Sequence, residues 1–326
     1  MNHRLQITQS WQDLVKHSIR DIGTLLSHLG LPEQPHFSEF PILVPEPYLS
    51  RIEKKNVTDP LLLQVLSSDL ETIQIPGYSN QPLDENKFSP VSGLIQKYNG
   101  RVLIISSSIC AINCRYCFRR HYPYEKSQLK EHQWDEILNR INNDHSIKEV
   151  ILSGGDPLML TDKILSRIVS KIEALEHVKT LRLHTRMPMV IPQRINHQLL
   201  GWVKSTRLQI VLVNHINHER EIDSAVHEAM KQLQQAGVTL LNQSVLLKGI
   251  NDTESSLIKL SEKLFSVGIL PYYVHMLDPV SGAAHFNVKQ KNAVALIEKI
   301  KNQLPGYLVP KLVREVPGEW AKKALY

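Results

Sequence analysis

The chain has 326 residues, of which 42% are hydrophobic and 21% are charged. This composition is typical of a soluble globular protein, and the length suits one α/β barrel or about two domains. The formal net charge of +6 comes without a block of one sign, which excludes a nucleic-acid-binding tail. No apolar run approaches the ~20 residues of a membrane span, and the start, MNHRLQITQSWQD, lacks the apolar core of a secretory signal. We therefore expect a cytoplasmic protein with neither a membrane nor a nucleic-acid partner.

Residues 1–95 are expected to form a helical and extended segment that wraps around the rest of the chain. Apolar residues recur at helical spacing over residues 11–29, with Ser10 and Asp13 as a capping pair and Gly30 as the stop. Nine of the 18 prolines fall in the remainder of this segment, which predicts extended chain with a short helix at DPLLLQVL. We assign no chemistry to it.

Beyond this segment, short apolar runs alternate with longer runs of helical periodicity. Strands are expected to begin at residues 101, 149, 180, 208, 239 and 270, and helices over 129–143, 162–176, 219–236, 253–267 and 289–303. Nearly continuous apolar strands between helices are typical of a parallel sheet covered by helices. The expected fold class is α/β, a partial (βα)6 TIM-like barrel over residues 96–304, followed by a C-terminal segment over 305–326.

Polar and glycine-bearing motifs follow the predicted strands in turn. The cysteine-rich stretch CAINCRYCFRR follows the first strand, SGGDP the second, HTRMP the third and NHINH the fourth, while NQSVLLKGIND overlaps the end of the fifth and MLDPVSGAAHF the sixth. In sheets of this kind, ligands bind at the carboxyl ends of the strands. The motifs therefore predict one shared active-site mouth.

All three cysteines of the chain, Cys110, Cys114 and Cys117, lie in one loop with C-x3-C-x2-C spacing. An odd number of clustered thiols indicates metal or redox chemistry in a reducing compartment, not a disulfide framework. A closed zinc site needs four ligands, and a cubane iron–sulfur cluster usually takes four thiolates. The fourth ligand is either a residue such as His121 or an external molecule. A separate metal site at His215 and its neighbour in NHINH lacks a supporting carboxylate cluster.

This cysteine spacing directly after a first strand resembles the radical S-adenosylmethionine (SAM) superfamily. The resemblance implies a [4Fe–4S] cluster whose fourth iron binds SAM, and a one-electron reductant such as flavodoxin or ferredoxin. Electron transfer into the sulfonium then yields a 5′-deoxyadenosyl radical. The resemblance also implies that Gly154 and Gly155 let backbone approach SAM, with Asp156 fixing the turn or contacting SAM. Tyr116 packs either on the adenine or in the core.

A closer resemblance links five ordered motifs over residues 38–322 to the lysine 2,3-aminomutase family, above all its elongation factor P branch. The motifs are CRYCFRR, SGGDPL, RMPMVIPQRI, NQSVLLKGIND and YYVHMLDPVSGAAHF. The resemblance implies an isomerase that converts free L-lysine to (R)-β-lysine with SAM and pyridoxal phosphate. A separate ligase would then attach the product to elongation factor P. Two alternatives stay open: another radical SAM enzyme, for example one that modifies RNA, and a zinc-binding module without catalysis.

The family's pyridoxal phosphate sites map onto basic residues of this chain. The stretch VREVPGEWAKKALY resembles the family's lysine loop, and the resemblance implies that Lys322 forms the Schiff base, with Lys323 as the adjacent alternative. The cofactor's phosphate would be bound by Arg101 and Arg186, with Lys97 as a further basic group. Arginine forks match phosphate geometry.

The resemblance also implies the substrate and SAM contacts. Arg119 would bind the α-carboxylate of lysine, and Asp278 the distal ammonium, with Glu315 standing where the family has an aspartate. His215 and Gln243 would lie beside SAM. The longer relatives in this family carry additional C-terminal cysteines that bind zinc, whereas this chain has no spare thiol. We therefore expect no structural zinc and a smaller homo-oligomer.

Overall fold

The computed structural model describes residues 9–34, 38–122 and 129–325. Most of the N-terminal stretch on which the expectation of no secretory signal depends lies outside these residues. Within them, no helix has the length and the apolar character needed to cross a bilayer.

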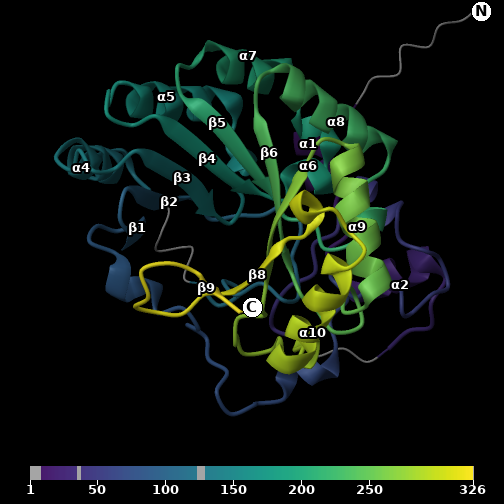
Figure 1. The fold of residues 1–326 in the computed structure, drawn as a ribbon. Helices are drawn as coiled ribbons and strands as arrows, with labels where there is room; N and C mark the ends of the chain where they lie inside the picture. Colours follow the sequence, from purple (N-terminus) through teal and green to yellow (C-terminus); the bar gives the residue numbers. More distant parts are fainter. Residues whose placement is uncertain (1–8, 35–37, 123–128, 326) are drawn as a thin grey trace, which may run out of the picture.

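In the described residues, nine strands form one sheet and follow each other in sequence order (Figure 1). Seven consecutive strands, β2 to β8, run parallel, while β1 and β9 pair antiparallel with their neighbours at the two edges. The strands are β1 (Leu94–Tyr98), β2 (Arg101–Ser107), β3 (Glu149–Gly154), β4 (Thr180–Thr185), β5 (Gln209–Asn214), β6 (Thr239–Val245), β7 (Leu270–His275), β8 (Lys311–Arg314) and β9 (Lys323–Ala324).

Helices cover the outer face of this curved sheet (Figure 1). They are α4 (Glu131–Asn142), α5 (Asp162–Glu173), α7 (His197–Ser205), α8 (Ser224–Gln235), α9 (Glu254–Ser266) and α10 (Gln290–Lys301), while the short, buried helix α6 (Met187–Val190) follows the end of β4. The α/β fold and the six expected strands are confirmed. The helix expected over 219–236 begins later, because the Asp223 side chain caps α8 by accepting from the N–H of Val226.

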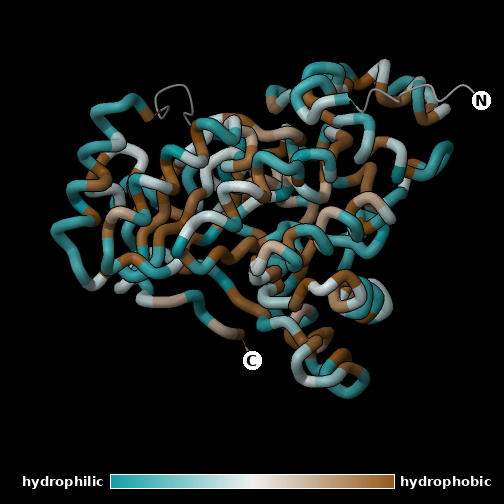
Figure 2. Tube along the Cα trace, turned by 90° about the horizontal axis from the view of Figure 1, so that it is seen from above, coloured by the Kyte–Doolittle hydropathy of each residue, from teal (hydrophilic) through white to brown (hydrophobic). Residues whose placement is uncertain are grey.

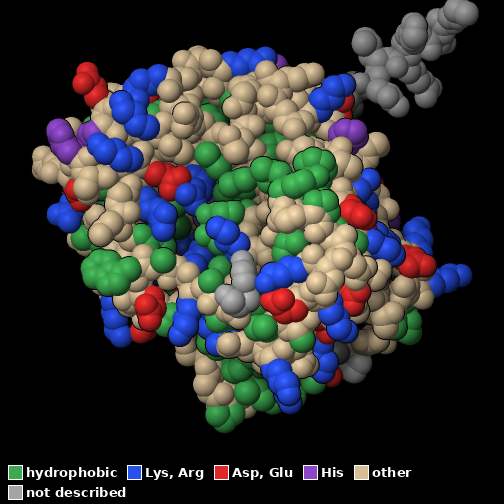
Figure 3. Space-filling view, viewed as in Figure 1, with side chains coloured by type: hydrophobic (Ala, Val, Ile, Leu, Met, Phe, Trp, Pro, Cys, Tyr) green, Lys and Arg blue, Asp and Glu red, His purple; other side chains and the backbone are tan. Residues whose placement is uncertain are grey.

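The main core lies between the sheet and these helices, where the apolar residues of the strands are almost fully enclosed. Ile104, Leu152 and Leu183 are among them. Complete burial of one such side chain stabilises the fold by about 1.5–3 kcal/mol. Figure 2 shows hydrophobic residues running through the interior and hydrophilic residues along the outer helices. On the face seen in Figure 3, cationic and anionic side chains are interspersed.

The N-terminal helix expected over residues 11–29 is wrong as a single element, because the structure contains two helices there. They are α1 (Trp11–Lys16) and α2 (Ile22–Leu29). Between them the chain extends, and Ile19 forms a β-bridge with Val44. The Asp21 side chain then caps α2 by accepting from the N–H of Thr24. A local cap and a pairing with a distant segment therefore override the helical periodicity.

The expected ends of this region are confirmed. Ser10 caps α1 through the N–H of Asp13, and Gly30 ends α2 with a φ of 66°. The helix expected at DPLLLQVL is absent, because the Asp59 carboxylate accepts the N–H groups of Leu61 and Leu62 and holds the stretch in turns. The short helix α3 (Glu46–Leu49) and the 3-10 turns η1 (Asp69–Thr72) and η2 (Glu85–Phe88) complete the wrapping segment.

Candidate active site

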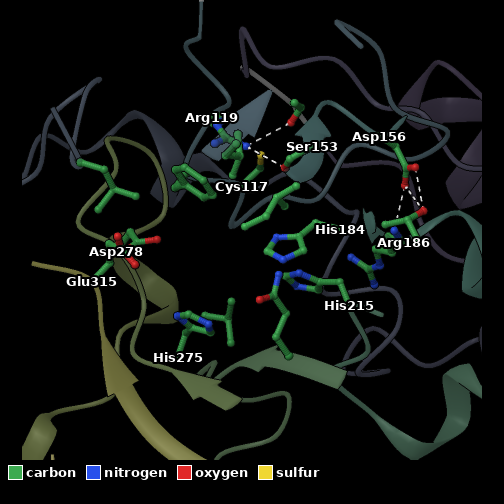
Figure 4. A pocket seen from close by; sticks show the side chains of 18 of the residues that line it. Cys117, Arg119, Ser153, Asp156, His184, Arg186, His215, His275, Asp278 and Glu315 are labelled. Carbon is green, nitrogen blue, oxygen red and sulfur yellow. Dashed lines mark hydrogen bonds between the residues drawn. The ribbon is translucent and has the colours of Figure 1, made fainter. Parts of the chain in front are cut away.

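The carboxyl ends of the parallel strands surround a cavity of about 340 Å³ (Figure 4). This volume is in the range of small-molecule sites, and the position is the one expected for ligand binding in such sheets. Apart from the alternatives Lys323 and His121, the residues expected at a site all line this cavity: Lys97, Arg101, Cys110, Cys114, Cys117, Arg119, Gly154, Gly155, Asp156, Arg186, His215, Gln243, Asp278, Glu315 and Lys322.

The two glycines after β3 allow the cysteine loop to lie directly against that strand end. The N–H of Gly155 donates to the carbonyl of Ser107 at 2.8 Å. A Cβ on Gly155 would lie 2.4 Å from the carbonyl oxygen of Ile109, and a Cβ on Gly154 would lie 2.4 Å from that of Ser107. Gly154 also has a φ of +120°, which favours glycine. The absence of side chains at these glycines therefore lets the backbone at the start of the cysteine loop approach the end of β3.

Asp156 fixes the next loop. Its carboxylate accepts from the Thr185 hydroxyl at 2.7 Å and from the backbone N–H groups of Arg186 and Met187 at 2.8 and 3.0 Å. Of the two roles open for Asp156, these contacts favour holding the turn. The carboxylate thereby ties the end of β3 to the end of β4.

The three cysteines carry free thiols. Burial is the largest cause that raises the pKa of Cys117 to about 11, and it also raises the pKa of Cys110. Such thiols become thiolates when metal binds them. In a cubane cluster the three thiolates bind three different irons, so they need not converge on one point. The donor set therefore fits an iron–sulfur cluster with one iron open to an external ligand.

The structure does not support the closed zinc site. His121 is exposed, does not line the cavity, and places its Nε2 3.1 Å from the carbonyl of Ser281. Across residues 9–34, 38–122 and 129–325, no three His, Cys, Asp or Glu side chains are grouped as ligands of a single metal ion. The imidazole of His218, the other histidine of NHINH, accepts from the N–H of Arg220 at 3.2 Å and does not line the cavity.

Arg119 is bound by an acid that the sequence analysis missed. Its Nε and Nη2 donate to the two carboxylate oxygens of Glu85 at 2.9 and 2.7 Å, and its Nη1 donates to the hydroxyl of Ser153 at 3.3 Å (Figure 4). Burial opposes ionisation of Glu85, but the guanidinium outweighs it and lowers the pKa of this carboxyl. The bidentate pair fixes the plane of the guanidinium at the cavity wall.

At another side of the cavity, Glu315 gathers cationic and hydroxyl groups. Lys322 Nζ lies 2.6 Å from one carboxylate oxygen, the Tyr98 hydroxyl donates to the other at 2.5 Å, and Lys97 Nζ lies 3.6 Å from that same oxygen. Asp278 lies beside Glu315 (Figure 4). Burial, followed by the charge of Glu315, raises the pKa of Asp278 to about 7.

The two candidate lysines occupy different environments. Lys322 lines the cavity and contacts Glu315. Lys323 is exposed and does not line the cavity, since neighbouring residues of an extended chain point to opposite sides. This placement favours Lys322 as the amine available to a ligand.

The basic residues assigned to a phosphate do not lie together. Lys97 on β1 and Arg101 on β2 are near each other in sequence, and the Arg101 guanidinium lies 4.6 Å from the ring centroid of Tyr98. Arg186 instead lies beside the cysteine loop, where it forms an ion pair with Glu221 at 2.9 Å. Arg186 thus lies on a different side of the cavity from Glu315 (Figure 4), and the phosphate role implied for it stays a prediction.

The half-buried His215 and the buried Tyr116 form a pair. Their rings are stacked with centroids 5.6 Å apart, and the Tyr116 hydroxyl lies 3.2 Å from His215 Nε2. Burial, followed by the charge of Arg186, lowers the pKa of His215 to about 3, so the imidazole is neutral. Tyr116 is 4% exposed and packs in a core cluster with Phe286. Of the two expected roles, packing on adenine or packing in the core, these contacts favour the core.

Two further histidines line the cavity and were missed. The Nε2 atoms of His184 and His275 are buried and have no hydrogen-bond partner among the described residues. Burial lowers the pKa of both well below the usual value, so both imidazoles are neutral. A buried polar atom without a partner is costly, and these two fit a polar ligand such as pyridoxal phosphate. His184 lies in the motif HTRMP and His275 in YYVHMLDP, so the position of each at a strand end could have indicated a site residue.

Comparisons with known proteins identify the family. The model described as "Radical SAM superfamily" matches residues 104–260, which carry the cysteines and glycines. The L-lysine 2,3-aminomutase of Haemophilus influenzae is 46% identical over 98% of this chain and 96% of that protein. The chain belongs to the L-lysine 2,3-aminomutase family. The enzyme of that name from Escherichia coli is 46% identical over 88% of this chain and 83% of its own length. The one from Clostridium subterminale is 31% identical over 96% of this chain and 76% of its own length.

Membership in the L-lysine 2,3-aminomutase family confirms the expected radical SAM isomerase. The superfamily implies a [4Fe–4S] cluster and SAM. This membership favours the isomerase over the two alternatives, an RNA-modifying radical enzyme and a zinc-binding module.

Proposed function

We propose that this chain converts free L-lysine to β-lysine, as the R isomer, with a [4Fe–4S] cluster, SAM and pyridoxal phosphate. The observation that carries the proposal is the content of one cavity. It combines three thiols, a lysine amine, a guanidinium for a carboxylate and two carboxylates for an ammonium. Lysine is the common amino acid whose two ends match such a pair of sites.

The cluster would be held by Cys110, Cys114 and Cys117, with SAM on the remaining iron near His215 and Gln243. When bound, the cluster and SAM supply a carbon radical that removes hydrogen from an unactivated C–H bond. Apolar side chains such as Ile95, Val102 and Val190 line the same cavity and exclude water from it.

Pyridoxal phosphate would be held by Lys322, with Arg101 and Lys97 toward its phosphate and His184 and His275 as hydrogen-bond partners. When bound, it supplies a π-system that stabilises an unpaired electron during migration of the amino group. The expected role of Arg186 at the phosphate is not part of this proposal, since its guanidinium lies beside Cys114 and the cysteine loop.

The substrate would be held at both ends by residues of this chain. Arg119, fixed by Glu85, binds the α-carboxylate. Glu315 already binds a primary ammonium, that of Lys322. Once the Lys322 amine engages the cofactor, Glu315 and Asp278 accept the distal ammonium of lysine. Two acids on the Glu315 side of the cavity would select lysine, whose distal ammonium can reach them, over shorter amino acids.

The cellular role that we propose is modification of elongation factor P in the cytoplasm. Support comes from the resemblance of the motifs to that branch and from the similarity to the Haemophilus influenzae enzyme over nearly its full length. Three free thiols fit a reducing compartment. A flavodoxin or ferredoxin would supply the electron, and a separate ligase would transfer β-lysine to the factor.

Product analysis tests the proposal. The anaerobically reconstituted protein, loaded with iron, sulfide, SAM and pyridoxal phosphate, is reduced and incubated either with L-lysine or with elongation factor P that already carries α-lysine. Chiral separation should detect (R)-β-lysine from the free amino acid. If free lysine stays unchanged while the factor-bound lysine isomerises, the proposed substrate is wrong. If neither reacts, the proposed function is wrong.

A further inference from the structure

A buried arginine–glutamate pair lies directly behind the cysteine loop. Arg186 follows β4 and is 7% exposed, and Glu221 lies in the 3-10 turn η6 (Glu219–Glu221) and is fully buried. Arg186 Nη2 donates to Glu221 at 2.9 Å. Arg186 Nη1 lies 2.7 Å from Cys114 Sγ. One guanidinium thus bridges a carboxylate and a predicted cluster ligand.

The surrounding contacts hold this guanidinium in place. Its Nη2 also donates to the side-chain carbonyl of Gln64 at 2.7 Å. Glu221 in turn accepts from the N–H groups of Asn217 and His218 at 2.9 and 3.1 Å. Because both partners are anchored, these contacts hold the Arg186 guanidinium beside Cys114.

The charge of this pair bears on cluster reduction. Adding an electron makes the cluster and its sulfurs more negative, so an N–H donor and a positive charge beside a sulfur stabilise the reduced form. Glu221 offsets part of that positive charge. The Nε of Arg186 is also buried without a partner in the described residues, which leaves one more donor in this region.

From this geometry we infer that Arg186 is a positioning residue of the iron–sulfur cluster, which donates a hydrogen bond to the Cys114 thiolate and raises the reduction potential of the cluster. Glu221 sets the size of this effect by balancing the guanidinium charge. The inference depends on the cluster of the proposed function, and it assigns Arg186 to the electron-transfer step in place of phosphate binding.

The test is an EPR-monitored redox titration of reconstituted protein without SAM or lysine, after iron and sulfide are quantified. Arg186→Met should shift the midpoint potential to a more negative value. Glu221→Gln should shift it to a more positive value, because the guanidinium charge is then unbalanced. Arg186→Lys keeps a cationic donor and should give a shift smaller than that of Arg186→Met.

Arg194→Met is the matched control. Arg194 is fully buried and binds Asp162 at 2.9 Å, but it contacts no cysteine, so its loss should leave the potential unchanged. General loosening of the core cannot produce shifts of opposite sign. If Arg186→Met fails to retain iron, Arg186→Lys and Glu221→Gln carry the test.

Two results separate the inference from the proposed function. Shifts of the same sign, or no shift, in variants with full iron content overturn the inference and leave the proposed function standing. An unmodified protein that binds no iron overturns both.

Discussion

Asp278 is the carboxyl of the cavity whose charge changes near neutral pH. Burial and Glu315 raise its pKa to about 7, so it is mostly neutral below this pH and anionic above it. Binding of an ammonium should therefore strengthen as pH rises, and kcat/KM for lysine should fall about tenfold per unit below pH 7. Glu315 should not contribute in this range, because its pKa is lowered.

The pH profile of Asp278→Asn is the control. This variant should have a lower kcat/KM that no longer changes around pH 7, while SAM binding stays close to that of the unmodified protein. A wild-type profile that is flat between pH 6 and 8, or an identical profile in the variant, would contradict the role of Asp278.

Lys322 and Lys323 provide a second comparison between single residues. Lys322→Ala should lose the visible absorption of covalently bound pyridoxal phosphate, because Lys322 lines the cavity and Lys323 does not. Lys323→Ala should keep that absorption, and both variants should keep their iron. The reverse pattern of absorption would move the assignment to Lys323.

At the level of single residues, motif resemblance predicted which side chains meet at the cavity but not what holds them there. Tyr98 and Glu315 are 217 positions apart, and Arg119 and Glu85 are 34 apart. The N-terminal prolines and turns around Glu85 carry no chemical signature of their own. Arg186 shows the limit most clearly, since its place in the cavity was expected but its ion pair with Glu221 was not.

Among the elements, the contact between β3 and the cysteine loop is open to a direct test. Gly155→Ala places a Cβ 2.4 Å from the Ile109 carbonyl. The loop must shift, at a cost of about 1–3 kcal/mol, and the reconstituted protein should hold less iron. Gly201→Ala, in α7, has no atom within 4 Å of the new Cβ and should stabilise the fold by about 0.5–1 kcal/mol.

Iron content and thermal unfolding temperature should be measured for Gly155→Ala, Gly201→Ala and the unmodified protein. An unchanged iron content in Gly155→Ala, with the same unfolding temperature, would show that the glycine is not needed for the approach of the cysteine loop.

Periodicity predicted the central strands and most outer helices because their apolar patterns are long and regular. It failed where short elements depend on distant partners. The strand β8 has four residues and β9 has two, too few for a pattern, and they form by pairing with β7 and with each other. The break between α1 and α2 likewise follows from the pairing of Ile19 with Val44.

On the scale of the whole molecule, the cavity joins the two edges of an open sheet. Lys97 and Tyr98 belong to β1 at one edge, and Glu315 and Lys322 flank the antiparallel pair at the other. Their contacts bridge the edges without strand pairing. The predicted partial barrel is thus confirmed as an open sheet, and in the described residues Glu315 beside one edge contacts Tyr98 and Lys97 at the other.

This arrangement makes the proposed cluster side and the proposed lysine side parts of one cavity. Hydrogen should therefore pass between SAM and lysine without exchange with water.

The most direct test uses SAM labelled with deuterium at its 5′ carbon, incubated with the reduced, fully loaded protein and unlabelled L-lysine. We expect deuterium in the β-lysine product, measured by mass spectrometry. Formation of β-lysine that carries hydrogen from solvent and no deuterium from SAM would contradict a shared cavity for the two chemistries.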